Sequence, residues 1–308
     1  MEQTQFSETS KRQPFKWTKL HLNRLNDVLI ILKELEEYKP LTLRQVFYQL
    51  VGKGLIANTT SSYITLGQLI KFARIDKYIP WSDIEDRTRA YYNLAGWDDV
   101  DEFVEASLEQ FLVGYDRDLM QTQKVYLEIW IEKNALSSIF TKVAKQYTIR
   151  VVVTAFGSTS FLNDYRERLE YHKHQRPIVL YFGDFDPSGL SMLPTMQETL
   201  EMEMKVTGIR YKHIALEKED IILYNLPHKA EAIKKKDTRT KDHVAKHGML
   251  AVELDALTPD VLEQKIKDAI ETEIDMDAYN AEINKQEKEF IILNKFKTKV
   301  VNFLRPTK

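Results

Sequence analysis

The chain of 308 residues contains no cysteine, which excludes disulfides and thiolate metal sites and is typical of proteins in a reducing compartment. Only 10 glycines and 9 prolines occur, so extended disorder is not expected. No apolar run is long enough to span a membrane, and the polar arm of residues 1–16 lacks the apolar core of a signal peptide. We therefore expect a soluble cytoplasmic protein that does not interact with a membrane.

The net charge of −2 gives no evidence of a nucleic-acid partner, but the charge is unevenly distributed. Residues 1–96 carry 14 basic and 10 acidic side chains, whereas residues 97–120 carry eight acids and one base, Arg117. Residues 229–246 hold seven bases and three acids. For this last segment, a DNA contact and a solvated surface both remain open.

The first 96 residues have the pattern of a small helical domain. Between residues 17 and 38, leucines follow one another at helical spacing. Thr42 and Gln45 have the spacing of a capping box, so a second helix should start at Thr42 and stop near Gly52 or Gly54. The leucines of the first helix are Leu22, Leu25, Leu29 and Leu32.

A third helix is predicted after the turn-like segment 57–62. Its apolar stripe consists of Leu66, Leu69, Ile70 and Ala73. Lys71 and Arg74 share another part of its surface, where they are candidate DNA contacts. Three helices closed by tight turns indicate a helix-turn-helix or winged-helix DNA-binding domain over residues 17–96, and the acidic segment 97–120 is expected to form a connecting helix.

From residue 121 the pattern changes to alternating strands and helices. Four segments have strand composition, and a helix-length segment separates each from the next. This alternation predicts an α/β domain over residues 121–258, with a mostly parallel sheet covered on both faces. The strand segments are 125–132, 149–156, 177–184 and 211–217. Residues 259–308 are expected to form helices.

Two of these strands end in acidic residues. Glu132 ends the first, while Asp184 ends the third and is followed by Asp186. Because loops at the carboxyl edge of a parallel sheet converge, neighbouring strands would bring three carboxylates together, and a cation would be needed to neutralise them. Oxygen ligands suit Mg²⁺, with Mn²⁺ as a substitute. The alternative is a purely structural role, in which these acids only cap helices or form turns.

At these residues the sequence resembles a known fold. A strand that ends in Glu132, followed by one that ends in D-x-D, resembles the Toprim fold. Residues 131–135, I-E-K-N-A, and 184–189, D-F-D-P-S-G, are similar to the motifs V-E-K-x-A and D-G-D-P-x-G of one family with this fold. Residues 252–257, with Glu253, resemble a later E-L-x-A-L element. The closest resemblance is to the A subunit of topoisomerase VI and its meiotic relative. It implies a Mg²⁺ site at Glu132, Asp184 and Asp186, with Lys133 catalytic and Glu253 in support.

A tyrosine on a winged-helix domain is the nucleophile of that family, in a motif similar to R-D-x-[FY]-Y. Residues 44–48 read R-Q-V-F-Y, with Gln45 in place of the acid, and place Arg44 one turn before Tyr48. The apolar spacing predicts that Tyr48 lies well off the buried face of its helix. That buried face should consist of Leu43, Val46, Phe47, Leu50 and Val51. The resemblance implies that Tyr48 attacks the DNA phosphate and that Arg44 binds it.

The resemblance also implies partners. It predicts double-stranded DNA as substrate, a homodimer with shared sites and, because no ATP-binding signature occurs, a separate ATPase subunit for strand passage. The compact length is similar to that of the stand-alone Mini-A type homologues of mobile elements, which implies association with the nucleoid of a prokaryotic or phage-infected cell. The sequence departs from the family at one turn: after the second strand, where the family has a G-Y-P-type turn, residues 155–159 read A-F-G-S-T.

Two other functions remain open: a Toprim nuclease that uses a metal-bound water, and a non-catalytic DNA-binding or assembly protein. His243 and His247 have a spacing seen in zinc sites, but without a third ligand we interpret them as a pair on a helix surface.

Overall fold

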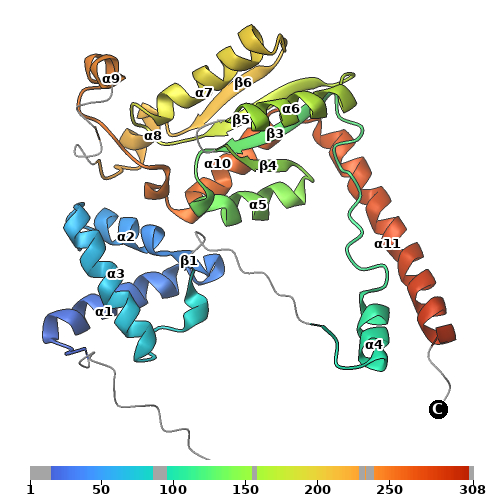
Figure 1. The fold of residues 1–308 in the computed structure, drawn as a ribbon, viewed down its shortest axis with the longest axis horizontal. Coiled ribbons are helices and arrows are strands. Elements are labelled where there is room, and N and C mark those ends of the chain that lie inside the picture. The colour runs from blue at the N-terminus through green and yellow to red at the C-terminus, as the bar shows by residue number, and fades with distance from the viewer. Residues whose placement is uncertain (1–14, 86–95, 155–157, 229–232, 234–238, 305–308) are drawn as a thin grey trace, which may run out of the picture. The chain divides into compact units, whose positions relative to one another are not determined.

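The structure is a computed structural model that describes residues 15–85, 96–154, 158–228, 233 and 239–304. It divides into two compact units, Met1–Glu85 and Asp86–Lys308, which are coloured from blue to green and from green to red in Figure 1. The division thus comes before the predicted boundary at residue 96. Most of the predicted arm, and half of the basic segment 229–246, lie outside the described residues.

The first unit contains the three predicted helices. They are α1 (Lys19–Glu34), α2 (Leu43–Gly52) and α3 (Thr60–Ile75), with short 3₁₀ turns at Glu36–Tyr38 and Trp81–Asp83. The strands β1 (Leu41–Thr42) and β2 (Ile84–Glu85) pair in parallel. Residues 15–85 contain no antiparallel hairpin, so the wing of a winged helix is not part of the described unit.

The second helix begins as the sequence predicts. Oγ1 of Thr42 accepts a hydrogen bond from the backbone N–H of Gln45 at 3.2 Å, and Oε1 of Gln45 accepts one from the backbone N–H of Thr42 at 2.7 Å. This capping box satisfies two N–H groups that lack partners within the helix.

The first helix buries only two of its four predicted leucines, Leu25 and Leu32. Leu22 and Leu29 are 44% and 37% exposed. Both α2 and α3 pack against α1. The side of α1 that they cover includes Val28 and Ile31 but leaves Leu22 and Leu29 exposed. The buried residues of α1 are Leu25, Val28, Ile31 and Leu32.

The second unit is built on the predicted parallel sheet. Its strands are β3 (Val125–Ile131), β4 (Arg150–Val153), β5 (Arg176–Phe182) and β6 (Arg210–Ala215). They are all parallel, in the order β4-β3-β5-β6. The two central strands therefore end side by side, and the mixed α/β prediction is confirmed.

Helices cover both faces of this sheet (Figure 1). On one face, Trp130 and Tyr181 form a buried cluster with Tyr165 of α6 and with α7. On the other, the ring of Phe140 in α5 packs edge-on against Phe182, with centroids 4.8 Å apart. The helices of this unit are α4 (Val100–Gln110), α5 (Ser137–Gln146), α6 (Thr159–Tyr171), α7 (Gly189–Glu198), α8 (Lys218–Leu223), α9 (Thr240–His247), α10 (Pro259–Glu271) and α11 (Met276–Leu304).

The acidic segment 97–120 is helical only over α4. Beyond it the chain turns at Gly114, which has a positive φ of 88°. Arg117 then forms ion pairs with Glu282 and Glu289 of α11, both at 2.6 Å, so side-chain contacts fix this stretch in place of a longer helix. In the described ranges, no helix is both long and apolar enough to cross a membrane.

Candidate active site

The ends of β3 and β5 bring two of the predicted carboxylates together. Glu132 follows β3 directly, and its backbone N–H donates to the carbonyl oxygen of Phe182 at 3.0 Å. The backbone N–H of Asp184 in turn donates to Oε2 of Glu132 at 2.9 Å. The parallel pairing of the strands thus places both acids at one edge of the sheet.

Asp184 also contacts Lys133 and the segment that contains Glu253 at this edge of the sheet. Its Oδ1 accepts a hydrogen bond from the backbone N–H of Leu254 at 3.0 Å, and its Oδ2 pairs with Lys133 Nζ. Lys133 Nζ lies 3.5 Å from Oε2 of Glu253. The structure therefore gathers Glu132, Lys133, Asp184 and Glu253, which are up to 121 positions apart in the sequence, at one site.

The third predicted ligand, Asp186, stabilises the start of α7. Its Oδ1 accepts a hydrogen bond from the backbone N–H of Gly189 at 2.7 Å. A Cβ atom at position 189 would lie 2.3 Å from the carbonyl oxygen of Asp184 and 3.0 Å from Oε2 of Glu132. Only glycine fits this close approach, so the D-x-D-P-S-G segment is folded tightly around the carboxylates.

The cluster is short of positive charge. Burial raises the pKa of Glu132 to about 7, and the nearby charge of Asp184 adds to the shift. Burial also raises the pKa of Asp184, although Lys133 and the N–H of Leu254 act in the opposite direction. Neighbouring carboxyls whose pKa values are both raised are typical of functional sites, where a bound cation would favour their ionised forms.

Whether these residues fit a divalent metal depends on Lys133. As placed, no three imidazole or acidic side chains in the described ranges surround one point as metal ligands would. In those ranges Glu132 Oε1 and Asp186 Oδ2 receive no hydrogen bond, while Lys133 occupies Asp184 Oδ2. The donors have the chemistry that Mg²⁺ prefers, but Lys133 would have to leave Asp184 for all three to bind it. The Mg²⁺ site stays a prediction.

The prediction that Tyr48 lies off the buried face is wrong, since Tyr48 is only 4% exposed. The cause is that α2 packs against α1, α3 and β1, so four consecutive side chains, which point in four directions around the helix, are all buried. The buried residues of α2 are Gln45, Val46, Phe47, Tyr48 and Leu50. Arg44, one turn earlier, is half-buried.

Of the two predicted DNA contacts, only Lys71 is exposed. The guanidinium of Arg74 donates to the carbonyl oxygen of Trp81 at 2.9 Å and lies 4.2 Å from the centre of the Trp81 ring. Burial lowers the pKa of Arg74. Arg74 therefore stabilises the first unit itself. The predicted apolar stripe of α3 is confirmed: Leu66, Leu69, Ile70 and Ala73 are buried.

The interpretation of the histidine pair as surface residues is wrong for His243, which is 5% exposed. Its Nε2 forms a hydrogen bond with the carbonyl oxygen of Leu250 at 2.7 Å. The rings of His243 and His247 lie 5.8 and 5.0 Å from that of Phe185, the residue between the two aspartates. An antiparallel bridge between Phe185 and Val252 brings α9 to the site. In the sequence, the contact between the histidines and Phe185 is signalled by the apolar Phe185 inside D-x-D.

Comparison with known proteins adds no family assignment. The sequence matches no protein-family model, and no curated protein is significantly similar to it. The functional argument therefore rests on the residues and contacts of this chain.

Proposed function

We propose that the second unit catalyses Mg²⁺-dependent cleavage of DNA phosphodiester bonds, with Tyr48 of the first unit as the attacking group. The observation that carries this proposal is the meeting of Glu132, Asp184 and Lys133 at the carboxyl edge of a parallel sheet. The raised pKa values of both acids support the binding of a cation beside them. The resemblance to the Toprim region of the topoisomerase VI A subunit supports DNA as substrate.

Each residue then has a chemical role. Bound Mg²⁺, held by Glu132, Asp184 and Asp186, would stabilise negative charge on the phosphate oxygens. Arg44 would bind the phosphate while the Tyr48 oxygen attacks phosphorus and gives its proton to a water molecule. A phosphotyrosyl bond forms, the bond from phosphorus to one strand oxygen breaks, and that oxygen leaves with a proton. The reverse reaction would reseal the strand.

The burial of Tyr48 favours a second candidate, a nuclease in which water attacks in place of the tyrosine. A phenol that is 4% exposed offers little access to a duplex, and the first unit would then only bind DNA. The two candidates differ in the chemical state of the cut ends.

The experiment is incubation with supercoiled DNA and Mg²⁺, followed by denaturation with and without protease. Transesterification leaves protein linked to the cut ends, and Tyr48→Phe should abolish the link while the protein stays folded. Cut DNA with free ends would support the nuclease, and intact DNA under all conditions would support a non-catalytic DNA-binding protein.

Tyr48 and the carboxylates belong to different compact units, so one site can be assembled from two chains. We propose a homodimer on double-stranded DNA with such shared sites, and a separate ATPase subunit if strands are passed. Mixed dimers of Tyr48→Phe and Asp184→Ala chains should nick one strand, because one of their two sites is intact. Mixed dimers as inactive as the parents would contradict shared sites without affecting the proposed chemistry.

A further inference from the structure

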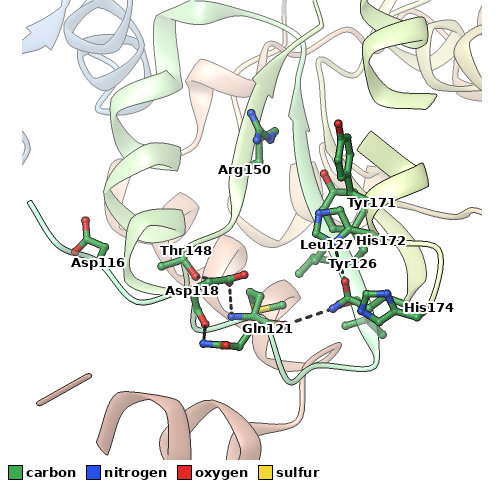
Figure 2. Close-up of a pocket in the computed structure, with 13 residues that line it drawn as sticks. Asp116, Asp118, Gln121, Tyr126, Leu127, Thr148, Arg150, Tyr171, His172 and His174 are labelled. Atoms are coloured by element: carbon green, nitrogen blue, oxygen red, sulfur yellow. Dashed lines mark hydrogen bonds between the residues drawn. The ribbon is translucent and has the colours of Figure 1, made fainter. Parts of the chain in front are cut away.

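A cavity of about 630 Å³ lies at the amino edge of the sheet, opposite the carboxylates (Figure 2). It is lined by the first residues of β3, by Arg150 at the start of β4, and by the chain that leads into β5. Its volume is within the range of small-molecule sites. The proposed cleavage reaction makes no use of this cavity.

One wall of the cavity has a defined hydrogen-bond pattern. The buried Gln175 side chain donates through Nε2 to three backbone carbonyls, which identifies Oε1 as its acceptor. His172 Nδ1, at 2.7 Å from that oxygen, must therefore carry a proton, which leaves Nε2 as the acceptor of the neutral ring. The ring of His172 stacks on Tyr126, with centroids 3.9 Å apart and planes 11° apart.

The rim combines an exposed aromatic ring with a cation. Tyr171 is 82% exposed, so its ring is open to contact with a ligand. The Arg150 side chain is 60% exposed, and the only carboxylate of the described residues near it is Glu128, at 3.9 Å. That carboxylate is already bound by Arg168 at 2.6 Å, so Arg150 has donors to offer a ligand.

The opposite side of the cavity carries acceptors. Asp116, Asp118 and Thr148 line the cavity too, and in Figure 2 they lie on the side away from Tyr171 and the two histidines. The cavity thus presents a stacking ring, a cation and acceptors for hydroxyl or amino groups. A nucleotide has the matching three parts, which are a base, a phosphate and a sugar.

We propose that this cavity binds a nucleoside monophosphate unit, with the base on Tyr171, the phosphate on Arg150 and the polar groups at Asp116 and Asp118. The unit is either a free nucleotide or the terminal nucleotide of a single strand, since both have the same chemistry. This inference does not depend on the proposed cleavage function.

The test is calorimetric titration of the full chain with deoxyadenosine monophosphate and with a short 5′-phosphorylated deoxyadenylate oligonucleotide. Tyr171→Ala and Arg150→Ala should each weaken binding by about tenfold or more, since base stacking contributes about 1–3 kcal/mol. Tyr224→Ala and Arg166→Ala, which remove exposed side chains of the same kinds away from the cavity, should bind as the parent does.

Binding of the mononucleotide identifies a free nucleotide as the ligand, and binding of the oligonucleotide alone identifies a strand end. Either result supports the proposal only if the two cavity variants lose affinity. No binding of either probe at millimolar concentration, or equal affinity in parent and cavity variants, overturns it. Asp184→Asn should retain nucleotide binding even if it cannot cleave DNA, so the two proposals fail separately.

Discussion

The backbone N–H of Asp184 donates a 2.9 Å hydrogen bond to Oε2 of Glu132, so one carboxylate of the candidate site holds the loop that carries the next. This contact couples the two acids in both position and charge. The acids therefore contribute to the fold of the site as well as to any chemistry performed there, and substitutions must be chosen to separate the two effects.

Asp184→Ala should destabilise the protein, although it removes a like charge. The change leaves the buried N–H of Leu254 without its acceptor and removes one of the carboxylate partners of Lys133, a loss of about 1–3 kcal/mol. Asp184→Asn keeps an oxygen that accepts from Leu254, so its free energy of unfolding should lie closer to that of the parent. Urea unfolding of the three proteins without metal decides this, and an Ala variant as stable as the parent would contradict it.

Stability should fall with rising pH because of Glu132. Its pKa is raised from 4.5 to about 7 in the folded state, so folding favours the protonated acid. The contribution is therefore fully present below pH 4.5 and is lost as the pH rises through about 7. Glu132→Gln should reduce this slope but not remove it, because the pKa of Asp184 is raised too.

The measurement is the free energy of unfolding of parent and Glu132→Gln protein at several pH values between 4 and 8. If Mg²⁺ binds the cluster, it should stabilise the parent more at the upper end of this range, where the carboxylates are ionised, than at the lower end. Equal slopes for both proteins would show that Glu132 does not titrate in this range.

Gly189→Ala should disrupt the site. The new Cβ would lie 2.3 Å from a backbone oxygen that cannot move without shifting Asp184, and overpacking of this kind costs about 1–3 kcal/mol. DNA cleavage should be lost together with this stability. Gly52→Ala is the matched control, because a Cβ at the end of α2 meets no atom within 4 Å. The prediction fails if both variants melt and cleave as the parent does.

Arg168→Ala should be among the most destabilising single changes in the second unit. Arg168 donates to both oxygens of Glu128, at 2.6 and 3.1 Å, and Glu128 is fully buried in β3. Removing the partner of a buried charge costs about 3–5 kcal/mol. Arg166→Ala, two positions away on an exposed part of α6, should change stability by less than about 0.5 kcal/mol. Chemical denaturation compares the two.

Lys71 and Arg74 should differ in their effect on DNA binding. Lys71→Ala should weaken binding and lower the salt slope by about 1, as the loss of one phosphate contact would. Arg74→Ala should mainly lower stability, because its guanidinium is held by Trp81. Titrations of a DNA duplex at several salt concentrations separate these effects, and a salt slope unchanged by Lys71→Ala would exclude α3 as the DNA surface.

The sequence by itself determined the local elements. The Thr42–Gln45 capping box set the start of α2, and the alternation of apolar strands with helix-length segments predicted the four parallel strands in their correct places. These features depend on neighbouring residues and on the periodicity of each element, which can be read without knowledge of the rest of the chain. The positions of Glu132 and Asp184 at strand ends followed from the same patterns.

The tertiary structure alone decided which side chains are buried and which are brought together. Tyr48 is buried because three elements pack around α2. Arg74 is fixed by its hydrogen bond to the carbonyl oxygen of Trp81, which the chain brings back to α3. His243 reaches the site through the bridge between Phe185 and Val252. A helical pattern defines one apolar face, but the number of elements that pack on a helix is set by contacts between residues far apart in the sequence, which no local pattern contains.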